Sequence, residues 1–513
     1  MIKTKKLFKN EWFYITLISI GYFILQFFLS NNLAMNSDEG THALTGLFYK
    51  DMIFNLKNFH SINDIVTFGI NYVVRYSKVT LYYPPLYHIL LVMVFLTKEN
   101  IMIARILNIL ITIVTSYVIY KLVYECFENK KISFFSLIFF LSFSIIFFYA
   151  NKVMIDVLQI LTFSLVLWYY FKLRKKQTIR FKNLLVLSIL IALSLLTKFY
   201  SVFIPIIILI DSFIQNKRFF IKILLSLFLA FLLISPYIYL YYKFHMSNLV
   251  IGKAVTPWES SLVFFDIFRN FGLFLGFFVA FSLFYFFYKN RKNYIFFIWL
   301  LIPLIVLLLL KNADPRYGFI LMPIYAMSCG FSFTEIERRL KGLKKNILIV
   351  FIFSIIVLQI IQDSYQNSQG PNYPVDDIMK AVKKNGNILI MSEDPVYSSV
   401  FMFYGRINEV PGNMIRSCVF SQSNLTNDFL NDWGIRYIID QENDLNDGLV
   451  KSLNLSLVLE KNTGGVSMRL FESNGEIKEV DCNFVCILMG KVCKNASFRE
   501  IIPLINKNIY TRD

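Results

Sequence analysis

Long runs of apolar residues alternate with short polar segments along most of the chain. Most runs have about 15 to 25 residues, the length at which a helix rising 1.5 Å per residue crosses a hydrocarbon core of about 30 Å. The first run is too long for a signal peptide and lacks a small-residue cleavage site, so we expect it to remain as a span. The pattern predicts eleven transmembrane helices, at residues 12–33, 101–124, 132–150, 157–171, 184–196, 199–214, 220–239, 271–288, 294–310, 319–333 and 347–361.

The apolar segment 84–97 is shorter than a transmembrane span usually is. The distribution of basic residues in the loops indicates whether it crosses the membrane. If it does not cross the membrane, five alternate loops between the later spans lie on the cytoplasmic side with the basic N-terminus, and together they hold nineteen Lys and Arg residues (130–131, 172–182, 217–222, 289–292 and 338–345). If it crosses, these residues move outside, which the positive-inside rule disfavours. We therefore predict an interfacial or re-entrant segment, a cytoplasmic N-terminus and a large non-cytoplasmic loop at 34–100.

The C-terminal region has a different pattern, with short β-rich runs at 387–391 and 435–440 among helical stretches and turn signals. It predicts a non-cytoplasmic α/β domain at 363–513 that follows a transmembrane domain at 1–362. The expected fold class is thus a polytopic α-helical membrane protein with about eleven spans and a C-terminal extracytoplasmic α/β domain. Both disulfides and free thiols remain open for the cysteines of this domain, Cys418, Cys482, Cys486 and Cys493.

Composition excludes an ordinary soluble enzyme, because 56% of the residues are hydrophobic and the mean hydropathy is +0.55. The formal net charge of +18 could indicate nucleic-acid binding. However, the basic residues cluster in short loops between apolar runs, where membrane topology alone would place them. We expect membrane lipids, and no nucleic acid, as partners.

Ionisable residues gather at the non-cytoplasmic ends of the predicted spans: Asp38, Glu39, Asp156, Lys198, Asp314 and Arg316. Taken singly, each has an equally good interpretation as a solvated loop residue or a headgroup anchor. Their shared depth favours a site, because charges near lipid are costly to keep. Carboxylates and cations together are able to deprotonate a hydroxyl and to stabilise a departing phosphate.

Six short motifs carry a resemblance to a known family. Taken together, in their order along the chain, these motifs resemble those of the GT-C membrane glycosyltransferases related to protein O-mannosyltransferases and bacterial aminoarabinose transferases. The resemblance covers residues 12–333. One departure is Tyr83, which stands just before the paired prolines where several relatives carry a basic residue. The motifs are Asp38-Glu39-Gly40-Thr41-His42-Ala43-Leu44, Tyr82-Tyr83-Pro84-Pro85-Leu86-Tyr87, Ala104-Arg105, the segment 141–156 ending in Asp156, Thr197-Lys198 and Pro315-Arg316-Tyr317.

The resemblance implies a GT-C-like fold and a hexosyl or pentosyl transferase. Such an enzyme moves a sugar, with inversion, from a polyprenyl-phosphate carrier to a protein, lipid or polysaccharide acceptor on the non-cytoplasmic side. In this picture Asp38 is the catalytic base, and Glu39 and Asp156 position the acceptor or an ion. The plasma membrane of a prokaryote is the expected location.

The resemblance also implies substrate-binding residues. Lys198 and Arg316, the latter followed by Tyr317, would bind the lipid phosphate, because an Arg fork and a Lys point charge suit phosphate oxygens. His42, Tyr83 and His88 would line a sugar pocket, although interfacial aromatics are also common membrane anchors.

No cofactor is expected, and a divalent metal is left open. With only four histidines in the chain, a zinc site would need His42 or His88 with Glu39.

Two other functions compete with the transferase hypothesis. A lipid or lipid-linked-sugar transporter or flippase would share the spans, but it should show inverted repeats and helices broken near the midplane, and the sequence shows neither. A non-catalytic membrane scaffold that displays the C-terminal domain is the second alternative.

Overall fold

The protein is described by a computed structural model. It describes residues 11–474 apart from residues 32, 34, 77–78, 80–82, 177–178, 246–270, 272, 292, 310–314, 369–373, 384–386, 392–397, 411–413, 417–425, 428–429, 431–434, 442–444, 446 and 464–465.

Within the described residues, each apolar run predicted to span the membrane is largely helical. Six helices are long and apolar enough to cross a membrane, and the pair formed by α7 and α8 would make a seventh. The helices α10, α11, α14 and α15 are apolar but shorter. The number of crossings therefore stays a prediction. The bounds are α2 Glu11–Asn31, α6 Ile101–Phe127, α7 Lys130–Ser142, α8 Ser144–Ala150, α9 Ile155–Arg174, α10 Phe181–Leu195, α11 Phe203–Gln215, α12 Lys217–His245, α14 Leu273–Lys289, α15 Tyr294–Leu309, α16 Met322–Arg339 and α17 Gly342–Ser368.

The predicted span 132–150 is not one straight helix. It is bent by 65° between α7 and α8, where Phe143 has extended backbone angles (φ −66°, ψ 124°). Because the side chains on both sides of the break are apolar, the sequence pattern continues through it unchanged.

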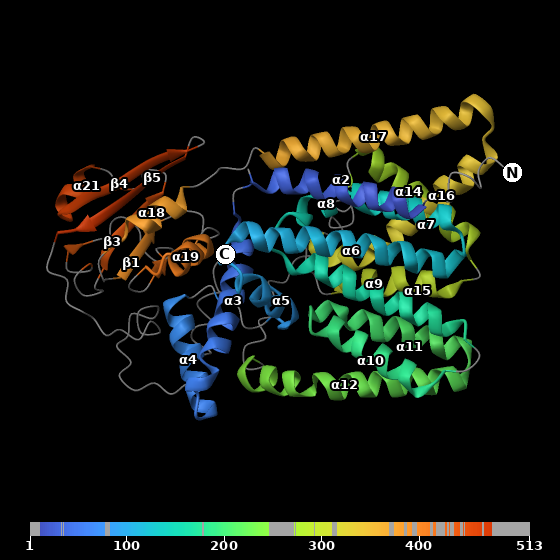
Figure 1. The fold of residues 1–513 in the computed structure, drawn as a ribbon, viewed down its shortest axis with the longest axis horizontal. Coiled ribbons are helices and arrows are strands. Elements are labelled where there is room, and N and C mark those ends of the chain that lie inside the picture. Colours follow the sequence, from blue (N-terminus) through green and yellow to red (C-terminus); the bar gives the residue numbers. More distant parts are fainter. Residues whose placement is uncertain are drawn as a thin grey trace.

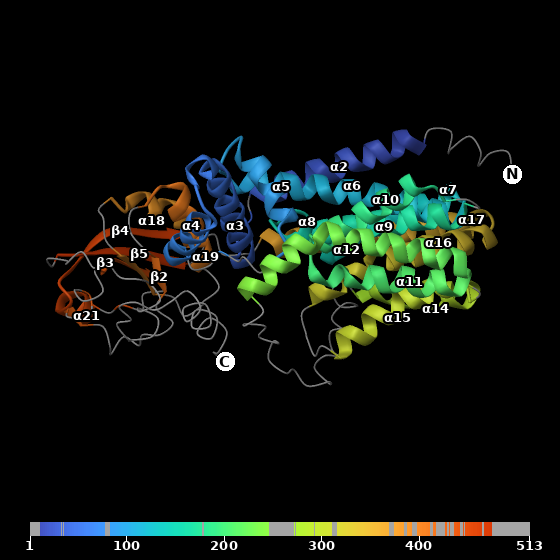
Figure 2. The same ribbon diagram turned by 90° about the horizontal axis from the view of Figure 1, so that it is seen from below.

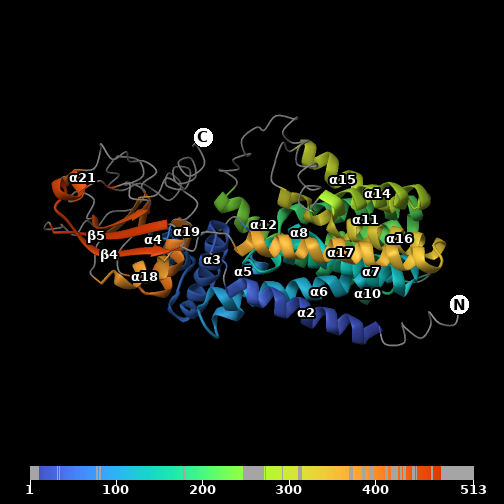
Figure 3. The ribbon, with the colours of Figure 1, turned by 90° about the horizontal axis from the view of Figure 1, so that it is seen from above.

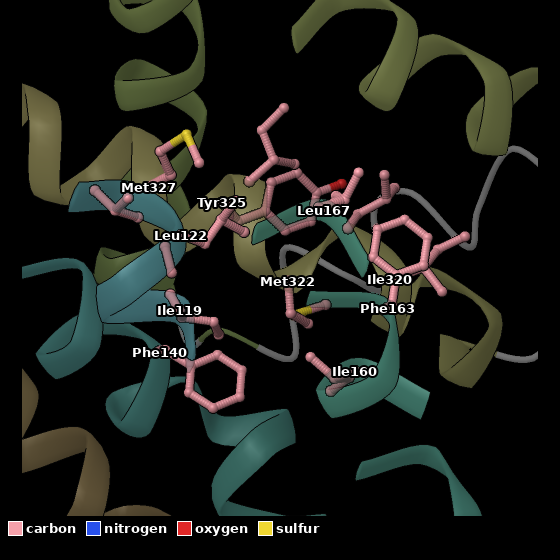
Figure 4. Close-up of a cluster of buried hydrophobic side chains, with 14 of the residues drawn as sticks. Ile119, Leu122, Phe140, Ile160, Phe163, Leu167, Ile320, Met322, Tyr325 and Met327 are labelled. Carbon is pink, nitrogen blue, oxygen red and sulfur yellow. The ribbon is translucent and has the colours of Figure 1, made fainter. Parts of the chain in front are cut away.

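Tightly packed apolar side chains hold the centre of the helical bundle together. The helices α6, α7, α9 and α16 meet there with the 3₁₀ segment η5 (Pro315–Leu321), which leads into α16 (Figure 4). All of the labelled side chains are almost completely buried: Ile119, Leu122, Phe140, Ile160, Phe163, Leu167, Ile320, Met322, Tyr325 and Met327.

One end of the bundle, which we call the domain end, carries the helices of the loop 34–100: α3 (Ser37–Phe54), α4 (Ile62–Arg75) and α5 (Leu86–Phe95) (Figure 1). α3 starts with a capping box, in which the Asn36 side chain and the Glu39 side chain each bond to the other residue's backbone N–H. α5 follows Pro84 and Pro85 and has only 10 residues, so it is much shorter than a span.

The C-terminal region contains the predicted sheet, with strand order β2-β1-β3-β5-β4. The predicted runs at 387–391 and 435–440 form its two central parallel strands, β1 and β3. The four cysteines of this region lie outside the described residues. The bounds are α18 Val375–Ala381, β1 Asn387–Met391, α19 Ser398–Ile407, β2 Met414–Arg416, β3 Ile435–Gln441, α21 Asp447–Ser452, β4 Leu455–Thr463 and β5 Val466–Ser473.

The sheet and the bundle are joined through α3. Figures 2 and 3 place the sheet at one end of the molecule and the bundle at the other, with α3 and α4 between them. Phe401 and Phe403 of α19 share one buried cluster with Leu44 and Leu47 of α3. The approach depends on Gly40, because a Cβ there would lie 2.8 Å from the carbonyl carbon of Ser399.

We expect Gly40→Ala to loosen this docking, because the new methyl group would have to push α19 away. Overpacking costs about 1–3 kcal/mol, which exceeds the gain of about 1 kcal/mol in helix propensity. The check is thermal unfolding together with limited proteolysis of the C-terminal region.

Gly69→Ala in α4 is the matched control, since its Cβ would meet nothing within 4 Å and the substitution should be neutral or stabilising. Equal shifts in the two variants would contradict the close approach at Gly40.

Candidate functional site

Three ion pairs meet at the domain end of the bundle, and they include five of the six charged residues singled out in the sequence. The sixth, Asp314, lies outside the described residues. Asp38 pairs with Arg316 (2.5 Å), Asp156 with Lys198 (2.6 Å), and Glu39 with Arg105 (2.9 Å). The partners come from α3, η5, α9, the turn after α10, and α6. Residues that lie up to 278 positions apart in the sequence are thus brought to one place.

The Glu39–Arg105 pair is the most deeply buried, with side chains 0% and 3% exposed. The Arg105 guanidinium donates two hydrogen bonds to the Glu39 carboxylate and two more to the backbone oxygens of Ser30 and Leu33. The Val153 N–H donates to the same carboxylate at 3.0 Å. This pair therefore fastens the end of α2, the start of α3, α6 and the segment 151–154 to one another.

The pKa of Glu39 reflects these contacts. Burial alone would raise it, but the charge and hydrogen bonds of Arg105, the charge of Lys152 and the Val153 N–H together hold it below its usual value. Glu39 was expected to position the acceptor or an ion. With its oxygens taken up by Arg105 and the backbone, its contacts favour a role in positioning the protein itself.

Asp38 is the neighbour of Glu39 but faces solvent. Consecutive residues of a helix point in different directions, so Glu39 turns inward while the Asp38 side chain stays 50% exposed. Its partner Arg316 is 25% exposed and stands in η5. A carboxylate in this position is open to a substrate hydroxyl. The side chain of Tyr317 lies outside the described part of the chain.

Asp156 and Lys198 form a more enclosed pair, with side chains 2% and 8% exposed. Asp156 stands in the first turn of α9, where the positive end of the helix dipole favours a carboxylate. Lys198 precedes the short segment η3 (Phe199–Val202). The Asp156 carboxylate thus holds the Lys198 ammonium in place.

The predicted sugar-pocket residues His42, Tyr83 and His88 also lie together. His42 Nδ1 and His88 Nε2 are 3.1 Å apart, and the Tyr83 ring centroid is 5.0 Å from that of His42. Burial lowers the pKa of His42 to about 3, helped by the positive charges of Arg316 and Lys198. His42 is therefore neutral at ordinary pH, and it lies within electrostatic reach of both cations.

Lys152 is a residue of this site that the sequence analysis missed. It stands between α8 and α9, is only 5% exposed, and its ammonium lies 3.1 Å from the centroid of the Phe148 ring. Among the described residues, this ammonium has no hydrogen bond or ion pair. Burial lowers its pKa to about 8, although the nearby Glu39 acts in the opposite direction. Its place in the short polar segment between the predicted spans 132–150 and 157–171 was the available signal.

Metal ligands do not gather at the site within the described residues. In the part of the chain that the structure describes, no group of three or more His, Cys, Asp or Glu side chains is placed to hold an ion. His42 and His88 bond to each other, and Glu39 bonds to Arg105, so the residues considered for zinc are already engaged.

Comparisons with known proteins agree with this architecture. Residues 82–242 match the family model described as dolichyl-phosphate-mannose-protein mannosyltransferase. This range includes Lys152, Asp156 and Lys198, but not Asp38 or Arg316. No sequence among the curated proteins matches the chain.

Two solved structures share the fold. ArnT from Cupriavidus metallidurans, bound to undecaprenyl phosphate, aligns with a TM-score of 0.60 and 11% identity, over 89% of this chain and 98% of ArnT. The oligosaccharyltransferase AglB from Archaeoglobus fulgidus, in complex with an inhibitory peptide and a dolichol-phosphate, aligns with a TM-score of 0.51 and 10% identity. This alignment covers 82% of this chain and 69% of AglB. The resemblance to GT-C membrane glycosyltransferases is thereby confirmed, and the fold is theirs.

We expect Glu39→Gln to destabilise the fold strongly, because it leaves the Arg105 guanidinium buried without a counter-charge. Breaking a buried pair costs about 3–5 kcal/mol. Thermal unfolding of the purified protein measures the loss.

Glu335→Gln is the control. It removes the carboxylate of an ion pair with Arg338, whose side chain is 71% exposed, and should cost less than about 1 kcal/mol. Similar losses in both variants would show that the Glu39–Arg105 pair does not fasten the domain end.

Proposed function

We propose that the protein is a glycosyltransferase that moves a sugar from a polyprenyl-phosphate carrier to an acceptor on the non-cytoplasmic side, with inversion. The observation that carries this proposal is the meeting of an exposed carboxylate, Asp38, with basic side chains at the domain end of a GT-C fold. A base beside an anion site matches what this reaction needs.

In the proposed reaction, Asp38 takes the proton of an acceptor hydroxyl as its oxygen attacks the anomeric carbon. The bond from that carbon to the phosphate oxygen breaks, and both of its electrons stay with the polyprenyl phosphate. Attack from the opposite face inverts the configuration. Phosphate is a good leaving group, so no general acid is required.

Three cations are available for the phosphate. Arg316 and Lys198 are paired with carboxylates in the present structure, so an arriving phosphate would share or replace those partners. Lys152 has no such partner among the described residues, which leaves its charge available. Lys152 and Lys198 are both largely buried, where water and salt weaken a charge-assisted bond to a phosphate oxygen less than at the surface. The contacts of Asp156 favour a role in holding Lys198.

A polyprenyl-phosphate donor is supported by the family model and by the carriers bound in the two similar structures. The orientation follows from charge. Lys131 and Lys345 pair with Glu337 near the start of α7, the start of α17 and the end of α16. These helix ends lie at the end of the bundle opposite the domain end (Figure 1). The positive-inside rule assigns this opposite end to the cytoplasm and the site to the outside. The acceptor would be a protein, a lipid or a polysaccharide.

We expect Asp38→Asn to reduce transfer by about 10²- to 10⁴-fold, because the amide cannot accept the hydroxyl proton. Lys198→Ala should also lower it, through loss of a phosphate contact. The assay follows labelled sugar from polyprenyl-phosphate donors into an extract of native membranes, at equal expression.

Lys341→Ala, a change in the turn before α17, serves as the control and should retain activity. If no donor is consumed and all variants behave alike, the transferase proposal fails, and a transporter or scaffold role takes its place.

Lys152 should give transfer a characteristic pH dependence. Its ammonium is charged below its pKa of about 8, so transfer should decline as the pH rises through this value. Lys152→Arg should remove the decline, because a guanidinium stays charged throughout. Lys152→Gln should be weakly active at every pH. A decline near pH 8 that persists in Lys152→Arg would assign the titration to another group.

A further inference from the structure

A pocket of about 510 Å³ lies between α3, α4 and the end of α19, away from the ion pairs described above. Its volume is within the range of about 300–1,000 Å³ that is usual for small-molecule sites. The loop 34–100 and the C-terminal region both contribute to its wall. It therefore exists only when the C-terminal region is docked.

Part of the wall is a neutral, rigid cluster. Asp51 receives two hydrogen bonds from Arg406, at 2.9 and 2.6 Å, and a third from the Tyr72 hydroxyl at 3.0 Å. Because the charges of Asp51 and Arg406 neutralise each other, this part of the wall favours neither an anionic nor a cationic ligand. The ring of Phe68 packs against that of Tyr72 and adds an apolar surface.

Arg75 supplies a hydrogen-bond donor that lacks an acceptor. Its Nη2 donates to the backbone oxygen of Val410 at 2.8 Å, which fixes the guanidinium. Its Nε is buried and, within the described part of the chain, bonds to nothing. The guanidinium lines the pocket beside the Tyr76 ring, 5.5 Å from the ring centroid, so a ligand that offers an oxygen to its remaining N–H groups would gain a charge-assisted hydrogen bond.

Glu409 supplies a carboxylate from a strained position. It has a positive φ of 52° at the end of α19, where the Val410 N–H bonds back to the Gly405 oxygen at 2.9 Å. Helices usually place glycine at such a position, because a side chain is strained there. The chain has a glutamate instead, and this residue lines the pocket. Strain of this kind is often maintained at binding sites.

We propose that this pocket binds a saccharide. Because Asp51 and Arg406 neutralise each other, an anion would still meet Glu409, a cation would still meet Arg75, and an apolar ligand would leave both Arg75 and Glu409 unpaired. A neutral molecule whose hydroxyls both donate and accept hydrogen bonds avoids all three penalties. The C–H faces of a sugar ring also match an aromatic surface.

The pocket and the ion-pair site share one helix. Asp38 and Asp51 are 13 residues apart in α3, which is about 20 Å at 1.5 Å per residue. The role of this saccharide rests on the proposed function. The bound saccharide is one part of a long glycan or glycolipid acceptor, and the hydroxyl at the other end of that acceptor reaches Asp38. Binding energy from such a remote part can support the reaction at the other end.

The test measures binding of labelled neutral gluco-, manno- and galacto-oligosaccharides to the full-length protein in nanodiscs, with uncharged peptides as a second set of probes. At least one oligosaccharide should bind saturably. Glu409→Gly should weaken it by about tenfold or more, which is the loss of one charge-assisted hydrogen bond. Asn71→Ala, at another lining residue, should also weaken it.

Glu409→Gly relieves the backbone strain, so its unfolding temperature should equal or exceed that of the wild type, and lost binding would not reflect unfolding. Glu128→Gly is the matched control, because Glu128 also has a φ of 52° after a helix, α6, that is not part of the pocket. This variant should bind like the wild type.

The proposal is overturned if no oligosaccharide binds, if binding is unchanged in Glu409→Gly, or if only the peptides bind. Asp38→Asn should still bind the oligosaccharide, because the pocket is intact. Binding without any transfer by the wild type would therefore overturn the transferase proposal alone. Transfer without binding would overturn the saccharide pocket alone.

Discussion

The structure of the domain end depends on the buried pair formed by Arg105 and Glu39. A guanidinium inside a protein is tolerated only when its donors are satisfied, and Arg105 reaches the Glu39 carboxylate and two backbone oxygens at the end of α2. These hydrogen bonds therefore fix the position of the first turn of α3 relative to α6. Once Glu39 points inward, helix geometry turns Asp38 outward toward Arg316. A structural ion pair thus determines where the proposed base stands.

The same helix also connects the bundle to the C-terminal region. α3 has the ion-pair site at its start, a glycine one residue after Glu39 that admits α19, and Asp51 near its end, bonded to Arg406. The apolar residues of α3, α5 and α19 form one cluster. The C-terminal region is therefore packed as part of the domain end.

Sequence patterns predicted what depends on local composition. Apolar runs located the helices of the bundle, the shortness of segment 84–97 predicted a helix too short to span, and β-rich runs located β1 and β3. Charges at span ends pointed to residues that the structure brings together. Three features depend on contacts between distant segments and had no local signal: the pairing of Arg105 with Glu39, the bend at Phe143, and the approach of Ser399 to Gly40.

A balance of charge links the site to the proposed reaction. The described residues place four cations there, Arg105, Lys152, Lys198 and Arg316, against three carboxylates, Asp38, Glu39 and Asp156. His42 and His88 stay neutral because burial lowers the pKa of each ring. The surplus of one positive charge equals the single negative charge of a phosphodiester donor. When Asp38 takes the acceptor proton, the surplus rises to two, which matches the phosphate monoester dianion that is released. The charges of the site would thus balance those of the donor and of the released product, so that neither state leaves the buried ammonium groups of Lys152 and Lys198 without a counter-charge.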